Sequence, residues 1–407
     1  MIVETDLESM ALALAATAAQ ARSLREFIAG AGTLWAATPL RVERIFMSLR
    51  MLHPAFRART YLWENDAREV RVIEWPHGLA NRPGYYHSPD HHVHRTRAEL
   101  RVPELSETSH HACDLYTTLA RQGFVDYLIV PLIFSDGTVN TCSIATRTPT
   151  GFPASGLGAF RSLVNTLTLI AERFTALEMV DSTLQTYLGR SASREVLRGK
   201  VRAGQGELVR AAILFADLVD FTSLTAQLGP TATVRLLNDY FDVLVGPIEQ
   251  HGGHVLKFIG DALLAFFPDL PDSQSPTPLE ALREIQLRIS ELNRVRAAAG
   301  EVPVWHALCL HYGEVLYGNI GASERLDFTI IGEAVNIAAR GVELAKQLRI
   351  DHLVTKAFAD RFQGSYATVG VHQLRGIPRP IAFLQFQRQP HPGTTSRPSE
   401  PAKADAR

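Results

Sequence analysis

The stretch HGGHVLKFIGDALLAFF, residues 251–267, decides how the C-terminal part of this chain folds. Two short apolar runs, 254–258 and 262–267, flank an Ile-Gly-Asp turn, so the pattern predicts a β-hairpin. Lys257 and Asp261 lie four positions apart at its tip. Taken alone, a lysine and an aspartate at a bend indicate no more than an ion pair on the surface.

A second acid changes this interpretation. Asp217 stands near the end of another apolar run, AAILFADLVDF. Two carboxylates at the ends of neighbouring strands provide the oxygen ligands that two divalent cations need when they clamp phosphate oxygens. We therefore expect Asp217 and Asp261 to lie side by side and to bind metal.

The bulk composition indicates a globular protein with more than one domain. The chain has 407 residues, a length that exceeds what one ordinary hydrophobic core accommodates. Of these residues, 46% are hydrophobic and 20% are charged, as in a globular protein. A net charge of -1 gives no general attraction to nucleic acid or to an anionic membrane. No apolar run approaches the ~20 residues that span a bilayer, and acids precede the alanine-rich N-terminal segment where a secretory signal would be basic. We expect a cytoplasmic protein that binds neither nucleic acid nor membrane, with its three scattered cysteines reduced.

The first half of the chain has the pattern of an α+β module. Helical spacing over 12–30 is followed by alternating strands between 60 and 76, a hairpin over 126–146 and a long helical pattern over 157–180. This order resembles the GAF-type sensor domains that precede output domains in bacterial signalling proteins. The resemblance implies an N-terminal helix and a GAF-like regulatory domain over 1–175, which responds to an unknown small molecule or signal.

A histidine-rich run in this module, YYHSPDHHVHR, invites a metal or haem interpretation. His87 and His91 are four positions apart, but Pro89 between them disfavours the helix that would align them. We therefore predict a solvent-exposed loop. The same prediction covers a second group: His110, His111 and Cys113.

A helical connector is predicted over 176–205. Its first half continues the preceding helix and carries an apolar stripe, which suggests a dimeric stalk; a helix packed on its own domain is the alternative. The stripe consists of Leu177, Val180, Leu184, Tyr187 and Leu188. An output domain follows over 206–388, and the tail 389–407 has the composition of a disordered segment.

Four motifs of the output domain carry a family resemblance. FADLVDFTSL, GGHVLKFIGDALLAFF, HYGEVLYGNIG and TIIGEAVNIAAR are similar, in order and spacing, to the catalytic domain of class III nucleotidyl cyclases over about 206–388. The resemblance implies an α+β fold of the ferredoxin-like, palm type. It also implies conversion of ATP to 3′,5′-cyclic AMP and pyrophosphate by in-line attack with two Mg²⁺ (or Mn²⁺) ions.

The same resemblance assigns roles to individual residues. Asp217 and Asp261 match the two metal aspartates, and Leu218 is placed to add a backbone carbonyl ligand. Asn336 and Arg340 match the asparagine that orients the ribose and the arginine that stabilises the transition state. Their i, i+4 spacing puts both on one face of a helix, and a planar guanidinium suits a pentavalent phosphate.

The resemblance assigns base selection to Lys257 and Thr329. Lys257 matches the lysine that contacts the adenine ring in adenylate cyclases, and the Thr329 hydroxyl can accept a hydrogen bond from the adenine amino group. Together they favour ATP over GTP. The chain departs from the family in LRGIPRP, where Ile377 stands in place of a triphosphate-binding lysine. We expect Arg375 or Arg379 to take over that contact.

The family builds its active site between two catalytic domains, so one such domain per chain implies a homodimer with two equivalent sites. We therefore expect a homodimeric adenylate cyclase controlled by its N-terminal domain. Guanylate cyclase activity is the nearest alternative, and a catalytically silent ligand sensor is an alternative of another class. A diguanylate cyclase is disfavoured because the GGDEF-type signature is absent.

Overall fold

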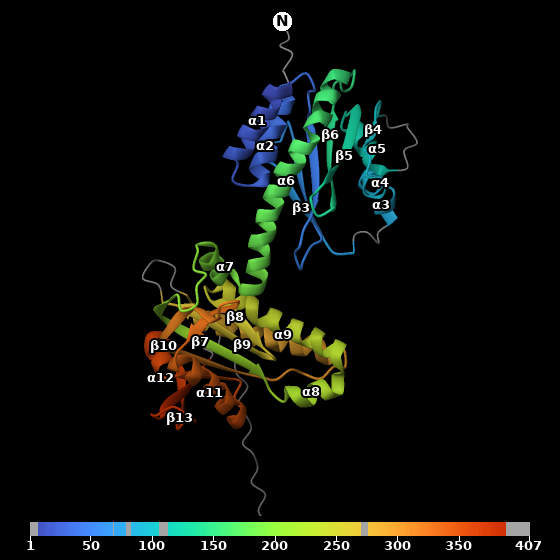
Figure 1. The fold of residues 1–407 in the computed structure, drawn as a ribbon. Coiled ribbons are helices and arrows are strands. Elements are labelled where there is room, and N and C mark those ends of the chain that lie inside the picture. Colours follow the sequence, from blue (N-terminus) through green and yellow to red (C-terminus); the bar gives the residue numbers. More distant parts are fainter. Residues whose placement is uncertain (1–6, 68, 79–82, 106–112, 270–275, 388–407) are drawn as a thin grey trace, which may run out of the picture. The chain divides into compact units, whose positions relative to one another are not determined.

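The fold is described from a computed structural model that covers residues 7–67, 69–78, 83–105, 113–269 and 276–387 (Figure 1). The chain divides into two compact units, Met1–Tyr187 and Leu188–Arg407. The predicted tail 389–407, together with His110 and His111, lies outside the described residues. Each unit is treated by itself below.

The N-terminal unit is built on an antiparallel sheet with the strand order β3-β2-β1-β6-β5-β4. Its strands are β1 (Arg44–Arg50), β2 (Ala58–Glu64), β3 (Arg71–Trp75), β4 (Leu100–Val102), β5 (Asp126–Ile133) and β6 (Val139–Thr146). The hairpin predicted over 126–146 is confirmed, since Ile133 pairs with Val139 across the turn. This part of the chain is an α+β domain, as expected.

One face of this sheet packs against α1 (Leu7–Gln20), α2 (Leu24–Ala36) and α6 (Ala154–Leu188) (Figure 1). The strands alternate, so every second side chain of β1 enters this core. The single helical segment predicted over 12–30 is wrong, because two helices occupy this region. The break falls before Ser23, whose hydroxyl accepts the backbone N–H of Glu26 and thereby caps α2.

The opposite face packs against α4 (Pro89–Thr96) and α5 (Asp114–Arg121), with the short α3 (Pro83–Tyr86) just before them. The prediction of a loop over the histidine-rich run is therefore wrong. Pro89 does not prevent a helix but begins one, because the first helical position needs no N–H donor. Ser88 caps this helix by accepting the N–H of His91 at 3.2 Å.

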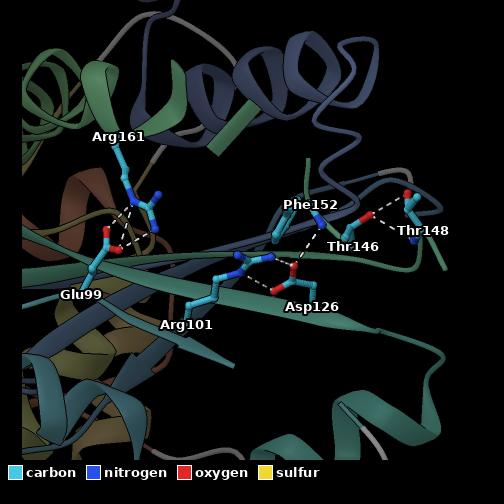
Figure 2. A network of polar contacts seen from close by, with 7 residues as sticks. All are labelled: Glu99, Arg101, Asp126, Thr146, Thr148, Phe152 and Arg161. Carbon is cyan, nitrogen blue, oxygen red and sulfur yellow. Dashed lines mark hydrogen bonds and ion pairs between the residues drawn. The ribbon is translucent and has the colours of Figure 1, made fainter. Parts of the chain in front are cut away.

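A buried carboxylate ties the edge of this sheet to the start of α6 (Figure 2). Asp126 at the start of β5 is 1% exposed. Its two oxygens accept hydrogen bonds from the Arg101 guanidinium of β4, at 3.2 and 2.6 Å, and one also accepts the backbone N–H of Phe152 at 2.9 Å. Figure 2 also shows Arg161 of α6 bound to Glu99, an exposed pair.

The C-terminal unit contains a mixed sheet with the order β13-β14-β12-β10-β7-β9-β8, and β11 pairs with β10. Its strands are β7 (Gly206–Leu218), β8 (His254–Ile259), β9 (Ala262–Pro268), β10 (His306–Ala322), β11 (Arg325–Ile331), β12 (His352–Thr355), β13 (Tyr366–His372) and β14 (Ile381–Phe386). The hairpin predicted from 251–267 is confirmed as β8 and β9. Strand β7 lies in the middle, between β9 and β10.

Helices cover both faces of this sheet. They are α7 (Arg190–Leu197), α8 (Phe221–Leu228), α9 (Pro230–Gln250), α10 (Pro278–Ala298), α11 (Glu333–Leu348) and α12 (Lys356–Arg361). The even-numbered residues of β7, such as Leu214, pack with α9, α10 and α12. Its odd-numbered residues, such as Ile213, lie on the face that α7 and α11 cover. Asp217 is odd-numbered and therefore belongs to the α11 face.

The segment predicted as a helical connector contains the end of α6, which stops at Leu188, and the whole of α7. Gly189 lies between them with φ 80°, a conformation that favours glycine. The stripe residues Leu177, Val180 and Tyr187 are 57%, 51% and 81% exposed. Within the ranges that the structure covers, none of the helices combines the length and hydrophobicity that a bilayer crossing requires.

Candidate active site

The two acids predicted to bind metal lie next to each other. Asp217 is the second-last residue of β7, and Asp261 follows Gly260 in the two-residue turn between β8 and β9. Gly260 has φ 65°, which suits the first position of such a turn. Since β7 pairs with β9 and Ala216 lies opposite Leu263, the end of β7 meets this turn. Strand pairing therefore brings together two acids that are 44 positions apart.

The two carboxylates of this acid pair are close enough for the charge of Asp217 to disfavour ionisation of Asp261. Burial, reinforced by a hydrogen bond to Asp217 and by its charge, raises the pKa of Asp261 to about 6. Asp217 Oδ1 is buried and, among the residues described, has no hydrogen-bond partner. Oxygen ligands of this kind suit Mg²⁺ or Mn²⁺, so the residues present fit a divalent cation.

The sequence did not predict a third residue at this site, Lys346. Its Nζ lies 2.6 Å from Asp217 Oδ2 and neutralises part of the acid pair. Lys346 stands on α11 at i+4 from Val342 and i+8 from Ala338, both buried. A lysine in line with an apolar stripe was the available signal, because such a charge needs a partner close to the core.

Further ligands for a cation must come from outside the acid pair. Throughout the described ranges, no three His, Cys, Asp or Glu side chains are grouped as a metal site. Leu218, the third predicted ligand, ends β7 with its side chain 1% exposed in the core. A leucine side chain carries no ligand atom, so only the backbone carbonyl of Leu218 could coordinate a metal.

The two base-selecting residues lie on β8 and β11, which contact each other but are not paired in the sheet. Lys257 Nζ is held 2.6 Å from Asp327 Oδ2, so the local ion pair with Asp261 is not formed. Thr329 is 5% exposed, and its Oγ1 is buried with no hydrogen-bond partner in the part of the chain that the structure describes. An unpaired buried hydroxyl is costly in a folded protein and is satisfied when a ligand supplies the missing group.

The predicted catalytic pair lies on α11. Asn336 is exposed, and Arg340 Nη1 lies 2.5 Å from Glu343 Oε1. Neither side chain makes a hydrogen bond or ion pair to the two acids within the described chain. Halfway along the helix, a Cβ at Gly341 would come within 2.3 Å of Cys309 Sγ, so α11 lies directly on β10.

The predicted triphosphate contacts follow α11 in sequence. Arg379 lies 3.2 Å from Glu333 at the start of α11, and Arg375 is exposed. Ile377, where the family has a lysine, is buried in the core under α11. An apolar residue at this position therefore stabilises the fold and leaves the triphosphate contact to other residues.

Comparisons with known proteins agree with this geometry. Residues 205–377 match the family model described as the adenylate and guanylate cyclase catalytic domain. An uncharacterized protein of Mycobacterium tuberculosis is 32% identical over 236 residues, 56% of this chain and 40% of that protein. The photoactivated adenylate cyclase subunit beta of Euglena gracilis is 29% identical over 212 residues, 50% of this chain and 24% of that protein. The chain thus spans less than half the length of these two relatives.

A solved structure of a bacterial light-regulated adenylyl cyclase is 27% identical to this chain, with a TM-score of 0.44. The match covers 56% of this chain and 64% of the other. The family match covers the whole of the acid pair, the base-selecting strands and α11. Residues 205–377 are therefore a class III nucleotidyl cyclase catalytic domain, adenylate or guanylate.

Proposed function

We propose that this protein is a homodimeric adenylate cyclase that converts ATP to 3′,5′-cyclic AMP and pyrophosphate, under the control of its N-terminal unit. The observation that carries the proposal is the pairing of Asp217 with Asp261 at the end of β7, beside strands that hold Lys257 and Thr329. The same proposal includes a cytoplasmic location for the enzyme, a catalytic domain bounded by residues 206–388 and the residue roles given below.

Asp217, Asp261 and the carbonyl of Leu218 are the ligands we assign to two Mg²⁺ (or Mn²⁺) ions. When bound, such ions activate the ribose 3′-hydroxyl and neutralise charge on the triphosphate. The chain itself holds one acid at the end of β7 and the other in the adjoining β8–β9 turn. It also supplies Lys346, which the cation must displace from Asp217.

Lys257 and Thr329 are proposed to select adenine. The buried Thr329 hydroxyl can accept a hydrogen bond from the adenine amino group, which would satisfy an atom that now has no partner in the described chain. Asp327 holds the Lys257 ammonium at 2.6 Å and restricts its position. The Euglena relative is named an adenylate cyclase, which also favours ATP.

Asn336 and Arg340 are proposed to act in the active site of the second subunit. Their lack of a contact to the acid pair of their own chain, within the described residues, supports this arrangement. A twofold axis would bring the acids of one chain to the α11 of the other and would create two equivalent sites. There, Asn336 would orient the ribose and Arg340 would stabilise charge on the transferred phosphoryl group, with Arg375 or Arg379 on the triphosphate.

Regulation is assigned to the N-terminal unit, for which we retain the GAF-like interpretation as a proposal. Its six-stranded antiparallel sheet has helices on both faces, an arrangement that leaves room for a ligand on one of them. The exposed apolar stripe of α6 supports a role for this helix in pairing two chains.

The test is turnover of ATP and GTP by the full-length protein with Mg²⁺ or Mn²⁺. We expect ATP to be preferred at least about tenfold in kcat/KM, and Lys257→Glu to lower that preference while the exposed Lys356→Glu leaves it unchanged. A preference for GTP would contradict the base assignment. No turnover of either nucleotide by the folded dimer would favour the silent sensor.

A further inference from the structure

The N-terminal unit contains a cavity of about 570 Å³ that none of its sequence patterns predicted. The sheet face that carries α3 and α4 lies opposite the face packed by α6 (Figure 1). The residues that line the cavity belong to the α3–α4 side. The walls of the cavity come from five separate parts of the chain: β1, the start of β2, β3, the α3–α4 segment and the start of β6. Its volume falls within the range of about 300–1,000 Å³ that is typical of small-molecule sites.

Aromatic side chains form its apolar walls. Phe46 of β1, Trp75 of β3 and Tyr85 of α3 all line the cavity. The Trp75 ring is fixed because its Nε1 donates to Thr60 Oγ1 at 2.8 Å, and the Tyr85 hydroxyl is held 2.8 Å from His94 Nδ1. Ring faces held in this way favour a flat, conjugated ligand.

A buried side-chain amide in the cavity wall has an unpaired N–H donor. Asn140 of β6 is 1% exposed, and its Oδ1 accepts the backbone N–H of Arg50 at 2.7 Å. Its Nδ2 is buried and has no partner among the residues that the structure describes. Leaving such a donor unpaired costs about 1–3 kcal/mol, so an acceptor atom of a ligand in the cavity would be bound favourably.

Two arginines give the cavity a positive charge. Arg50 and Arg57 line it, both are exposed, and neither side chain has an ion pair or hydrogen bond to another described residue. The one carboxylate in the wall, Asp90, already accepts the Thr141 hydroxyl at 2.6 Å through Oδ1. Two unpaired guanidinium groups beside aromatic faces are suited to a carboxylate, sulfonate or phosphate.

We propose that this cavity binds a planar aromatic small molecule that carries one anionic group. The ring lies among Phe46, Trp75 and Tyr85, the anionic group pairs with Arg50 and Arg57, and a ring acceptor takes the free Asn140 N–H. This assigns a ligand class to the N-terminal unit. Binding itself does not depend on the proposed cyclase activity, whereas any effect of the ligand on turnover does.

The test compares two fluorescent probes that share one ring system, on the full-length protein. 8-Anilinonaphthalene-1-sulfonate carries an anionic group, and N-phenyl-1-naphthylamine does not. We expect both to bind at one site per chain. The Arg50→Gln/Arg57→Gln double variant should weaken binding of the sulfonate probe about tenfold or more and change binding of the neutral probe less than twofold.

A matched double variant, Arg71→Gln/Arg161→Gln, removes the same charge from two exposed arginines that do not line the cavity. It should bind both probes as the wild type does. Ser48→Phe places a ring inside the cavity from β1 and should abolish binding of both probes. Circular dichroism and thermal melting check that each variant is folded.

Three results would overturn the proposal. They are the absence of saturable binding at one site, equal affinity of the two arginine double variants for the sulfonate probe, and undiminished binding by folded Ser48→Phe. If Ser48→Phe does not fold, the two arginine double variants still test the proposal. All four side chains that they replace are exposed or partly exposed, so these variants should fold. Binding is measured by fluorescence titration and folding by circular dichroism and thermal melting, so an inactive cyclase domain would leave this test unaffected.

Discussion

In the C-terminal unit, charged groups of the candidate active site are paired with one another, whereas the two arginines of the N-terminal cavity have no ion-pair partner among the described residues. Lys346 lies against Asp217, and Lys257 against Asp327. A ligand of the active site must therefore exchange existing ion pairs, and a ligand of the cavity meets groups that are already free. The first arrangement favours selectivity between ligands, because only a cation or nucleotide that replaces the lost contacts gains by binding.

The largest effect is expected at the acid pair. Asp217→Ala or Asp261→Ala should lower turnover on the order of 1,000-fold or more, because each change removes a carboxylate that we assign to metal binding. Asp242→Ala, at an exposed position of α9, is the control and should retain activity. Near-normal rates in either site variant, measured with saturating Mg²⁺ or Mn²⁺, would refute the metal assignment.

Mixing two inactive variants tests whether the acids of one chain and Arg340 of the other form one active site. Asp217→Ala and Arg340→Ala, mixed in equal amounts, should give about a quarter of wild-type turnover, because half of the dimers are mixed and each has one intact site. Each variant alone should remain inactive. Mixed dimers that are confirmed by mass but recover no activity would count against the shared site.

The N-terminal unit has an ion pair with a buried carboxylate, Asp126 with Arg101, and breaking it should act on stability rather than on the cyclase site. Asp126→Ala leaves the Arg101 guanidinium and the Phe152 N–H without their acceptor and should cost about 3 kcal/mol of unfolding free energy. Glu99→Ala breaks the exposed pair with Arg161 (Figure 2) and should cost less than about 1 kcal/mol. Urea unfolding measures the free energy of unfolding of both variants. Equal losses of stability would show that burial of the carboxylate does not determine how much an ion pair contributes.

The smallest effect is expected at Lys346. Lys346→Met removes the cation that now pairs with Asp217 and should tighten Mn²⁺ binding by about tenfold, or about 1.4 kcal/mol. Titration of Mn²⁺ by electron paramagnetic resonance measures this without turnover. Lys356→Met, at an exposed pair on α12, should leave the affinity unchanged. Weaker Mn²⁺ binding by Lys346→Met would contradict competition between lysine and metal.

The acid pair and its hairpin were predictable because both are encoded locally. Asp217 and Asp261 each end an apolar strand pattern, and antiparallel pairing of those strands is enough to bring them together. Helices α8 and α12 were missed because six to eight residues are too few for a helical period to stand out.

Groups that depend on packing between distant elements could not be predicted. Lys346 reaches Asp217 only because α11 packs on the β7 face, and its place in line with an apolar stripe does not identify that partner. The cavity draws residues from five segments, and Asn140 differs from a solvated asparagine only through its burial. The histidine-rich run was misread for another reason: Pro89 was taken as a helix breaker when it stands at a helix start.

Helix α11 has a consequence for how the two active sites of a dimer would fill. Asn336 and Lys346 are ten residues apart, about 15 Å along the axis, and the close contact at Gly341 holds the helix to β10 between them. In the proposed homodimer, the first residue would touch the nucleotide in one site and the second the metal carboxylate of the other. One helix would thus contribute to both active sites, so a substitution that shifts α11 would disturb a nucleotide contact in one site and the metal-binding acids in the other.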